Sequence, residues 1–136
     1  MKQFKLILLF TSLLATAAMA RDAAPPLQTS AAGIQYVVGG IGSEERKAMR
    51  SQYRFKLRVE HALKNGSYSA GMHIRIDDAQ GRELLETLID GPWLLVDLPA
   101  GEYQLTVLHK RREFSKKIML GSEAQQQVIF MWPDTE

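Results

Sequence analysis

The sequence contains no cysteine. That absence excludes disulfide bonds, a cysteine nucleophile, a thiolate metal site and a thiol redox motif. Small exported domains often depend on disulfides, so a domain without them must obtain its stability from a hydrophobic core.

Long apolar runs are also missing. The most apolar segment lies in residues 1–20, MKQFKLILLFTSLLATAAMA, where Lys2 and Lys5 precede an apolar stretch at 6–14. A membrane anchor is the alternative, but a bilayer span needs about 20 apolar residues. The pattern favours a secretory signal peptide cleaved near Ala20. We therefore expect a periplasmic or secreted protein without a transmembrane span in the mature chain.

A charge of one sign is not in excess either. The chain has 17 basic and 15 acidic residues, and Lys2 and Lys5 belong to the predicted signal peptide. The 116 residues after Ala20 are therefore formally neutral, which gives no electrostatic reason to expect a nucleic-acid partner. Their number suits one domain with its own core.

Residues 21–52 differ in composition from the rest of the chain. The stretch 21–35, RDAAPPLQTSAAGIQ, predicts an exposed linker because it is small, polar and contains proline. An apolar arm, GIQYVV, overlaps its end at 33–38. A short helix is predicted at 43–52, with Ser43 as its N-cap and two glutamates in its first turn.

The glycine-rich stretch 39–42, GGIG, allows three interpretations. A phosphate-binding loop needs a following lysine with serine or threonine, or a βαβ unit, and neither is present. A joint between arm and helix is favoured. The third interpretation is a docking segment, in which Tyr36, Val37 and Val38 lie along a sheet edge of their own domain or of a partner.

Apolar and polar residues alternate from Tyr53 onward, which predicts strands. Turn residues recur every 8 to 12 positions, the pattern of a β-sandwich. The predicted strands number seven and cover residues 53–64, 68–77, 82–90, 91–98, 102–109, 112–120 and 124–132. The sandwich domain is therefore predicted at 53–132, with a C-terminal tail at 133–136.

One turn between two of these strands reads LPAGEY. Leu98 ends one strand, Pro99 fixes φ, and Gly101 can adopt the positive φ of a sharp turn. Tyr103 begins the next strand, with its ring in the core and its hydroxyl available to a neighbouring loop.

The hexapeptide, together with Asp78 and Gly81 in an earlier turn, resembles the carboxypeptidase regulatory-like, transthyretin-like superfamily over residues 53–132. The resemblance implies an all-β, seven-stranded transthyretin-like sandwich, here with a short N-terminal helix. It does not imply a function, because one fold hosts many.

The strand pairing at Asn65-Gly66 has two solutions. A two-residue hairpin would pair Leu63 with Tyr68 in one sheet. The transthyretin-like topology would instead place the two strands in opposite sheets, and the resemblance favours this second solution.

The histidines give little sign of catalysis. A hydrolase of the transthyretin family would use histidines, an arginine and a C-terminal Tyr-Arg-Gly-Ser, but this chain ends in IFMWPDTE. Strand alternation places His61 on an inner face and His73 on an outer face, while His109 ends a later strand. We therefore predict no catalytic residue, no metal ligand and no cofactor.

A basic cluster surrounds a predicted hairpin tip. Its members are Lys110, Arg111, Arg112, Lys116 and Lys117. Such a cluster is typical of a solvated sheet edge protected by charge. The functional alternative is contact with an anionic envelope component or an acidic protein surface.

Together these observations predict a non-enzymatic exported module that interacts with another envelope protein or an anionic envelope component. The first alternative is a domain that binds a small ligand or a carbohydrate, for which an exposed Trp132 would be one sign. A transthyretin-like hydrolase is the third interpretation.

Overall fold

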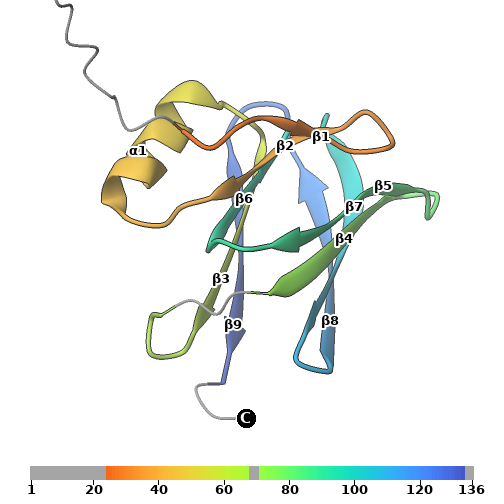
Figure 1. Cartoon of the computed structure of the whole chain (residues 1–136). Coiled ribbons are helices and arrows are strands. Elements are labelled where there is room, and N and C mark those ends of the chain that lie inside the picture. The colour runs from red at the N-terminus through yellow and green to blue at the C-terminus, as the bar shows by residue number, and fades with distance from the viewer. Residues whose placement is uncertain (1–23, 68–70, 134–136) are drawn as a thin grey trace, which may run out of the picture.

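The computed structural model describes residues 24–67 and 71–133. In this part of the chain, one helix and nine strands are present (Figure 1). The predicted signal peptide, its cleavage site near Ala20 and the last three residues lie outside the described residues. The elements are β1 (Gln28–Thr29), β2 (Gln35–Gly39), α1 (Ser43–Gln52), β3 (Leu57–Leu63), β4 (Met72–Asp78), β5 (Glu83–Ile89), β6 (Trp93–Val96), β7 (Gly101–His109), β8 (Arg112–Leu120) and β9 (Gln126–Trp132).

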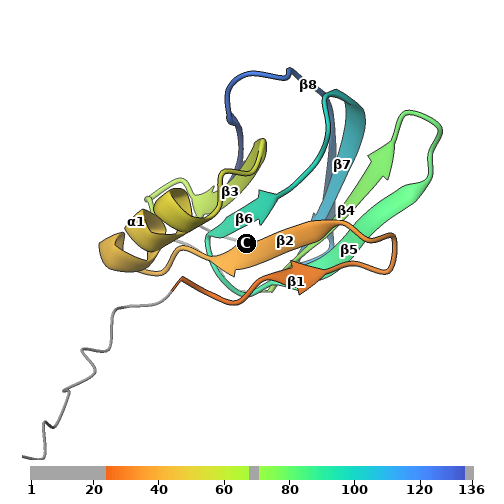
Figure 2. The same cartoon turned by 90° about the horizontal axis from the view of Figure 1, so that it is seen from above.

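The strands form two sheets that face each other across the core (Figure 2). The five-stranded sheet has the order β1-β2-β6-β3-β9, and the four-stranded sheet has the order β5-β4-β7-β8. All neighbouring pairs are antiparallel except β3 and β9. The predicted all-β sandwich with a short helix is confirmed. The predicted number of seven strands is wrong, because nine are present in the described residues.

The two additional strands, β1 and β2, come from the segment predicted as linker and arm. Strand β2 pairs with β6, with Tyr36 opposite Val96. Tyr36 packs in the core between the sheets, whereas Val37 points to the opposite face, and both are buried. The arm therefore packs on its own domain, because period-two alternation gives each face of β2 an apolar surface to cover. Contact of Tyr36, Val37 and Val38 with a partner is not supported.

The strands on either side of Asn65-Gly66 lie in different sheets. Strand β3 pairs with β6 on one edge and with β9 on the other, so no edge is left for β4. Strand β4 pairs with β5 and β7 instead. The two-residue hairpin is therefore wrong, and the opposite-sheet arrangement is confirmed. Tyr68 and Ala70 lie outside the described residues.

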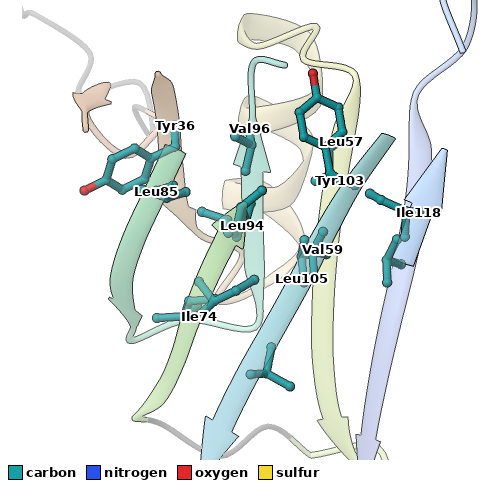
Figure 3. Packing of buried hydrophobic residues seen from close by; sticks show 14 of the residues in the cluster. Tyr36, Leu57, Val59, Ile74, Leu85, Leu94, Val96, Tyr103, Leu105 and Ile118 are labelled. Atoms are coloured by element: carbon teal, nitrogen blue, oxygen red, sulfur yellow. The ribbon is translucent and has the colours of Figure 1, made fainter. Parts of the chain in front are cut away.

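The main core fills the space between the sheets. Figure 3 shows Val59 and Leu94 from the five-stranded sheet and Ile74 and Leu105 from the four-stranded sheet among its members. These side chains are fully buried. Each such aliphatic side chain contributes about 1.5–3 kcal/mol by its removal from water.

Helix α1 lies against the outer face of the five-stranded sheet (Figure 2). A second, smaller apolar cluster of buried residues lies between the helix and this sheet. Met49 of the helix packs there against Val37, Trp93 and Leu95. Both faces of β6 are therefore covered, which explains its uninterrupted apolar sequence WLLV. Within the described residues, no helix is long and apolar enough to cross a membrane.

The turn LPAGEY adopts the expected geometry. The Tyr103 hydroxyl donates a hydrogen bond to the Pro99 carbonyl at 2.6 Å, and the ring is buried. Gly101 has a φ of 157°, which L side chains rarely adopt. Burial raises the pKa of Tyr103, and the negative charge of Asp78 acts in the same direction. The hydroxyl thus remains a donor at neutral pH.

The start of α1 differs from the prediction. Gly42 precedes the helix with a φ of 83°, and no side chain caps it, so Ser43 is not the N-cap. The Glu45 carboxylate instead accepts a hydrogen bond from the Gly40 amide at 2.9 Å. Arg46 donates to the Gly40 carbonyl at 3.0 Å. Two helix side chains therefore fix the glycine segment that precedes them.

The glycines at this joint are required by close packing. A Cβ on Gly40 would lie 2.8 Å from the Trp93 ring, and one on Gly39 would lie 2.4 Å from the Glu45 carboxylate. A Cβ on Gly91, at the entrance to β6, would lie 2.5 Å from the Gly39 carbonyl oxygen. The segment is a tightly packed contact between β2, α1 and β6.

This contact predicts that Gly91→Ala will lower the free energy of unfolding by about 1–3 kcal/mol, because the new methyl group meets backbone that must move. Gly121→Ala is the matched control, since a Cβ there meets nothing within 4 Å. Urea unfolding measures both variants. Equal stability of the two would contradict the packing described here.

Candidate functional site

The tip of the β7–β8 hairpin is a strained turn. His109 pairs with Arg112, which leaves Lys110 and Arg111 as a two-residue connection. Their φ angles are 46° and 67°, the left-handed region that glycine or asparagine usually occupies. Left-handed backbone costs a side chain roughly 1–2 kcal/mol. The fold therefore presents two cationic residues at a conformational cost.

The five predicted basic residues are exposed but do not form one patch. Arg112 directly follows the tip. Lys116 lies further along β8, where its Nζ donates to the Ile129 carbonyl of β9 at 2.8 Å. Lys117 lies on the opposite face of β8, because neighbouring side chains alternate along a strand. The structure thus brings together Lys110, Arg111 and Arg112.

Lys116 protects an open side of the sandwich. Strands β8 and β9 are edge strands of the two sheets. The Lys116 ammonium lies over the Phe130 ring at 4.6 Å, beside its hydrogen bond to β9. Phe114 and Trp132 pack edge to face nearby, with ring centroids 5.0 Å apart. A charged side chain at an edge disfavours pairing with another chain.

A second cationic site, which the sequence analysis missed, surrounds Trp93. Three guanidinium groups lie over its ring, Arg46 at 6.0 Å, Arg50 at 5.4 Å and Arg58 at 4.5 Å from the centroid. Arg46 and Arg50 are four residues apart on α1 and therefore share one helix face. Arg58 lies on the outer face of β3. The stacking buries Trp93 to 7% exposure.

Positive side chains outnumber negative ones around Trp93. Arg58 Nε lies 3.4 Å from a Glu60 carboxylate oxygen, and Gln127 donates a hydrogen bond to the other oxygen. Glu45 is bound to the Gly40 amide. Arg50 lies in the last turn of α1, where the helix dipole favours a cation. Among the described ion pairs, only Arg58 of the three arginines is paired with a carboxylate, that of Glu60, and Glu45 is the second carboxylate nearby.

Two hollows flank this arginine cluster. The first has a volume of about 600 Å³ and is lined by Arg46, Trp93, Glu60, Ala62, Ile129 and Met131, among others. The second has a volume of about 490 Å³ and is lined by Arg50, Tyr53, Arg54, Phe55, Lys56, Glu123 and Gln125. Arg54 and Lys56, which directly precede β3, therefore add positive charge to the second hollow.

The three histidines do not meet at one site, although His61 and His109 both lie in the core and are close enough to interact electrostatically. His61 and His109 are buried on inner faces, whereas His73 lies on the outer face of β4, 3.3 Å from Glu86. The predicted separation of His61 and His73 is confirmed. Among the described residues, no three His, Asp or Glu side chains are placed to hold a metal ion. Trp132 is only 2% exposed, so it is not the exposed tryptophan that sugar binding would need.

His61 is a titratable group inside the core. Its Nε2 lies 2.8 Å from the Gly91 carbonyl oxygen. Burial lowers the pKa of His61, and a positive charge on His109 would lower it further, whereas the hydrogen bond to Gly91 opposes the change. Burial has the largest effect because it removes the imidazolium from water.

Comparison with known proteins assigns no family to this chain. No protein-family model matches it, and no curated protein is significantly similar to it. The hairpin tip and the arginine cluster are therefore interpreted from their own geometry.

The lowered pKa of His61 predicts a dependence of stability on pH. In the unfolded chain, His61 takes up a proton near its ordinary pKa of about 6.5. In the folded chain the pKa of His61 is lower, so the same protonation needs a lower pH. Stability should therefore fall as the pH is lowered from 7 to 5, by at most about 1.4 kcal/mol per pH unit for this group.

The variant His61→Gln keeps a donor for the Gly91 carbonyl and should flatten the profile. His73→Gln, at the exposed histidine, is the matched control. Urea unfolding at several pH values measures both. An identical slope in His61→Gln and the unaltered chain would rule out His61 as its source.

Proposed function

We propose that the chain is a non-enzymatic, exported β-sandwich module of the cell envelope, and that its β7–β8 hairpin tip binds an anionic partner. The partner is an acidic surface of another envelope protein or an anionic envelope component. Export is supported by the signal-peptide pattern of residues 1–20. The observation that carries the proposal is the left-handed backbone at Lys110 and Arg111.

The strain at the tip argues for a role beyond edge protection. Asparagine and glycine would satisfy this turn at lower cost, yet the chain places two cations there. Edge protection is provided by Lys116, which bonds to β9. The tip cations lie between paired strands and protect no edge, so binding accounts better for their strained positions.

The alternatives have less support. A hydrolase would need convergent groups, but His73 lies on the opposite side of the four-stranded sheet from His109. Carbohydrate binding usually needs an accessible aromatic face, and both Trp93 and Trp132 are buried. A small-ligand site is favoured by one observation, the hollow beside Trp93.

We also propose that the sandwich is transthyretin-like. The bond from Tyr103 to Pro99 and the placement of β3 and β4 in opposite sheets support this proposal. Strands β1 and β2 would then be additions to the seven-stranded arrangement, laid against β6.

The hairpin proposal predicts opposite effects on stability and binding. The double variant Lys110→Asn, Arg111→Gly should raise the free energy of unfolding by about 1–2 kcal/mol, because the turn is relieved of strain. The same variant should lose most of its salt-sensitive binding to phosphatidylglycerol vesicles or to polyglutamate. Co-sedimentation and titration measure the binding, and urea unfolding measures the stability.

The matched control is Lys47→Gln, Lys64→Gln, which removes two exposed cations elsewhere. It should bind as the unaltered chain does. The proposal would be wrong if the unaltered chain bound neither probe, if the hairpin variant bound equally well, or if the control lost as much.

A further inference from the structure

The larger hollow lies on the outer face of the five-stranded sheet, beside α1. Its volume of about 600 Å³ is within the range of sites for small molecules, about 300–1,000 Å³. The helix contributes Arg46, β6 contributes Trp93, and β3 and β9 form the floor. Ligands bind preferentially in such concave places, where a few polar groups adjoin apolar walls.

The floor of the hollow carries an apolar patch. Ala62 pairs with Met131, and the preceding row pairs Glu60 with Ile129. Ile129 is 44% exposed and Met131 is 57% exposed, although both are large apolar side chains. Neighbouring apolar side chains left in water favour contact with an apolar molecule.

The wall of the hollow carries a cation. The Arg46 guanidinium uses one donor on the Gly40 carbonyl, out of the five that the group has. Arg46 and Arg50 carry like charges four residues apart, an arrangement that destabilises a helix. Arg58 adds a third positive charge over the same Trp93 ring. A bound anion would reduce the repulsion among these groups.

Among the described residues, Glu60 is the one carboxylate that lines this hollow, and it opposes an anion. Its oxygens already accept from Gln127 and pair with Arg58. That pairing leaves Arg46 and Arg50 without a carboxylate among their described ion pairs. Glu45 also keeps its negative charge beside Gly40. Three guanidinium charges against the two carboxylates Glu45 and Glu60 leave a local excess of one positive charge, and Glu60 limits the strength of binding.

We infer that this hollow binds a small amphipathic anion. A carboxylate or phosphate head pairs with Arg46, and an unbranched apolar body lies on Ala62, Ile129 and Met131. Arginine suits such heads because its planar donors match two oxygens. This site is separate from the hairpin tip and does not depend on the function proposed for it.

The test uses the full mature chain and four probes, each below its micelle concentration. Decanoate and decyl phosphate carry both head and body. Decyl maltoside has the body without the charge, and inorganic phosphate has the charge without the body. Calorimetric titration should show binding of the first two probes only. In Trp132→Phe, Trp93 is the single remaining tryptophan, and its fluorescence should change on binding.

Four variants locate the site. Arg46→Gln should weaken decanoate binding about fivefold to tenfold, and Met131→Gln should weaken it several-fold. Glu60→Gln should strengthen binding several-fold, because it removes the opposing charge. Lys47→Gln, which removes an exposed neighbouring cation, should have no effect. An increased affinity of Glu60→Gln for decanoate cannot be explained by unfolding of the variant.

The inference is overturned by any of three results. The first is equal binding of decyl maltoside or of inorganic phosphate. The second is equal affinity of Arg46→Gln and Lys47→Gln for decanoate. The third is loss of decanoate binding in the hairpin variant Lys110→Asn, Arg111→Gly, which would assign anion binding to the tip. Loss of vesicle binding alone in that variant leaves the hollow intact, so the two proposals fail independently.

Discussion

Strand β6 is buried on both faces, and the other elements are arranged around that constraint. Leu94 and Val96 face the main core, whereas Trp93 and Leu95 face outward and need a cover of their own. Strand β2 and helix α1 supply this cover. The backbone at Gly39, at the end of β2, can contact the backbone at Gly91, just before β6, because neither residue has a side chain. The segment before the predicted domain is therefore part of the sandwich.

The arginine cluster is a consequence of the same cover. Met49 contacts Trp93 from the helix, and the guanidinium groups of Arg46, Arg50 and Arg58 lie over its ring. A guanidinium is planar and stacks favourably on an aromatic face. Packing thus concentrates three positive charges at one place. The charge excess and the hollow beside it arise from how an outward-facing tryptophan is buried.

The sequence predicted well those features that depend on residues close together in the chain. Period-two alternation and the spacing of turn residues together predicted the strands from β3 to β9, and the acidic first turn predicted α1. Strand β6, WLLV, has no alternation and was predicted from the turns around it. Strand β2 was predicted only as an apolar arm, because a short apolar run gives no indication of which sheet it joins. The cation site at Trp93 was missed because residues 46, 58 and 93 are distant in sequence. Their meeting depends on the pairing of β3 with β6 and on the docking of α1.

The two cationic surfaces differ in shape, so they suit different classes of partner. The hairpin tip ends two paired strands at one end of the sandwich (Figure 1), so it presents its charges to a surface. The cluster at Trp93 borders a hollow with an apolar floor, so it can enclose a small molecule. At the tip, the cationic residues have strained left-handed backbone, whereas in the cluster the guanidinium groups stack on the Trp93 ring. The β7–β8 hairpin belongs to the four-stranded sheet and α1 packs on the five-stranded sheet, so the two surfaces share no residue.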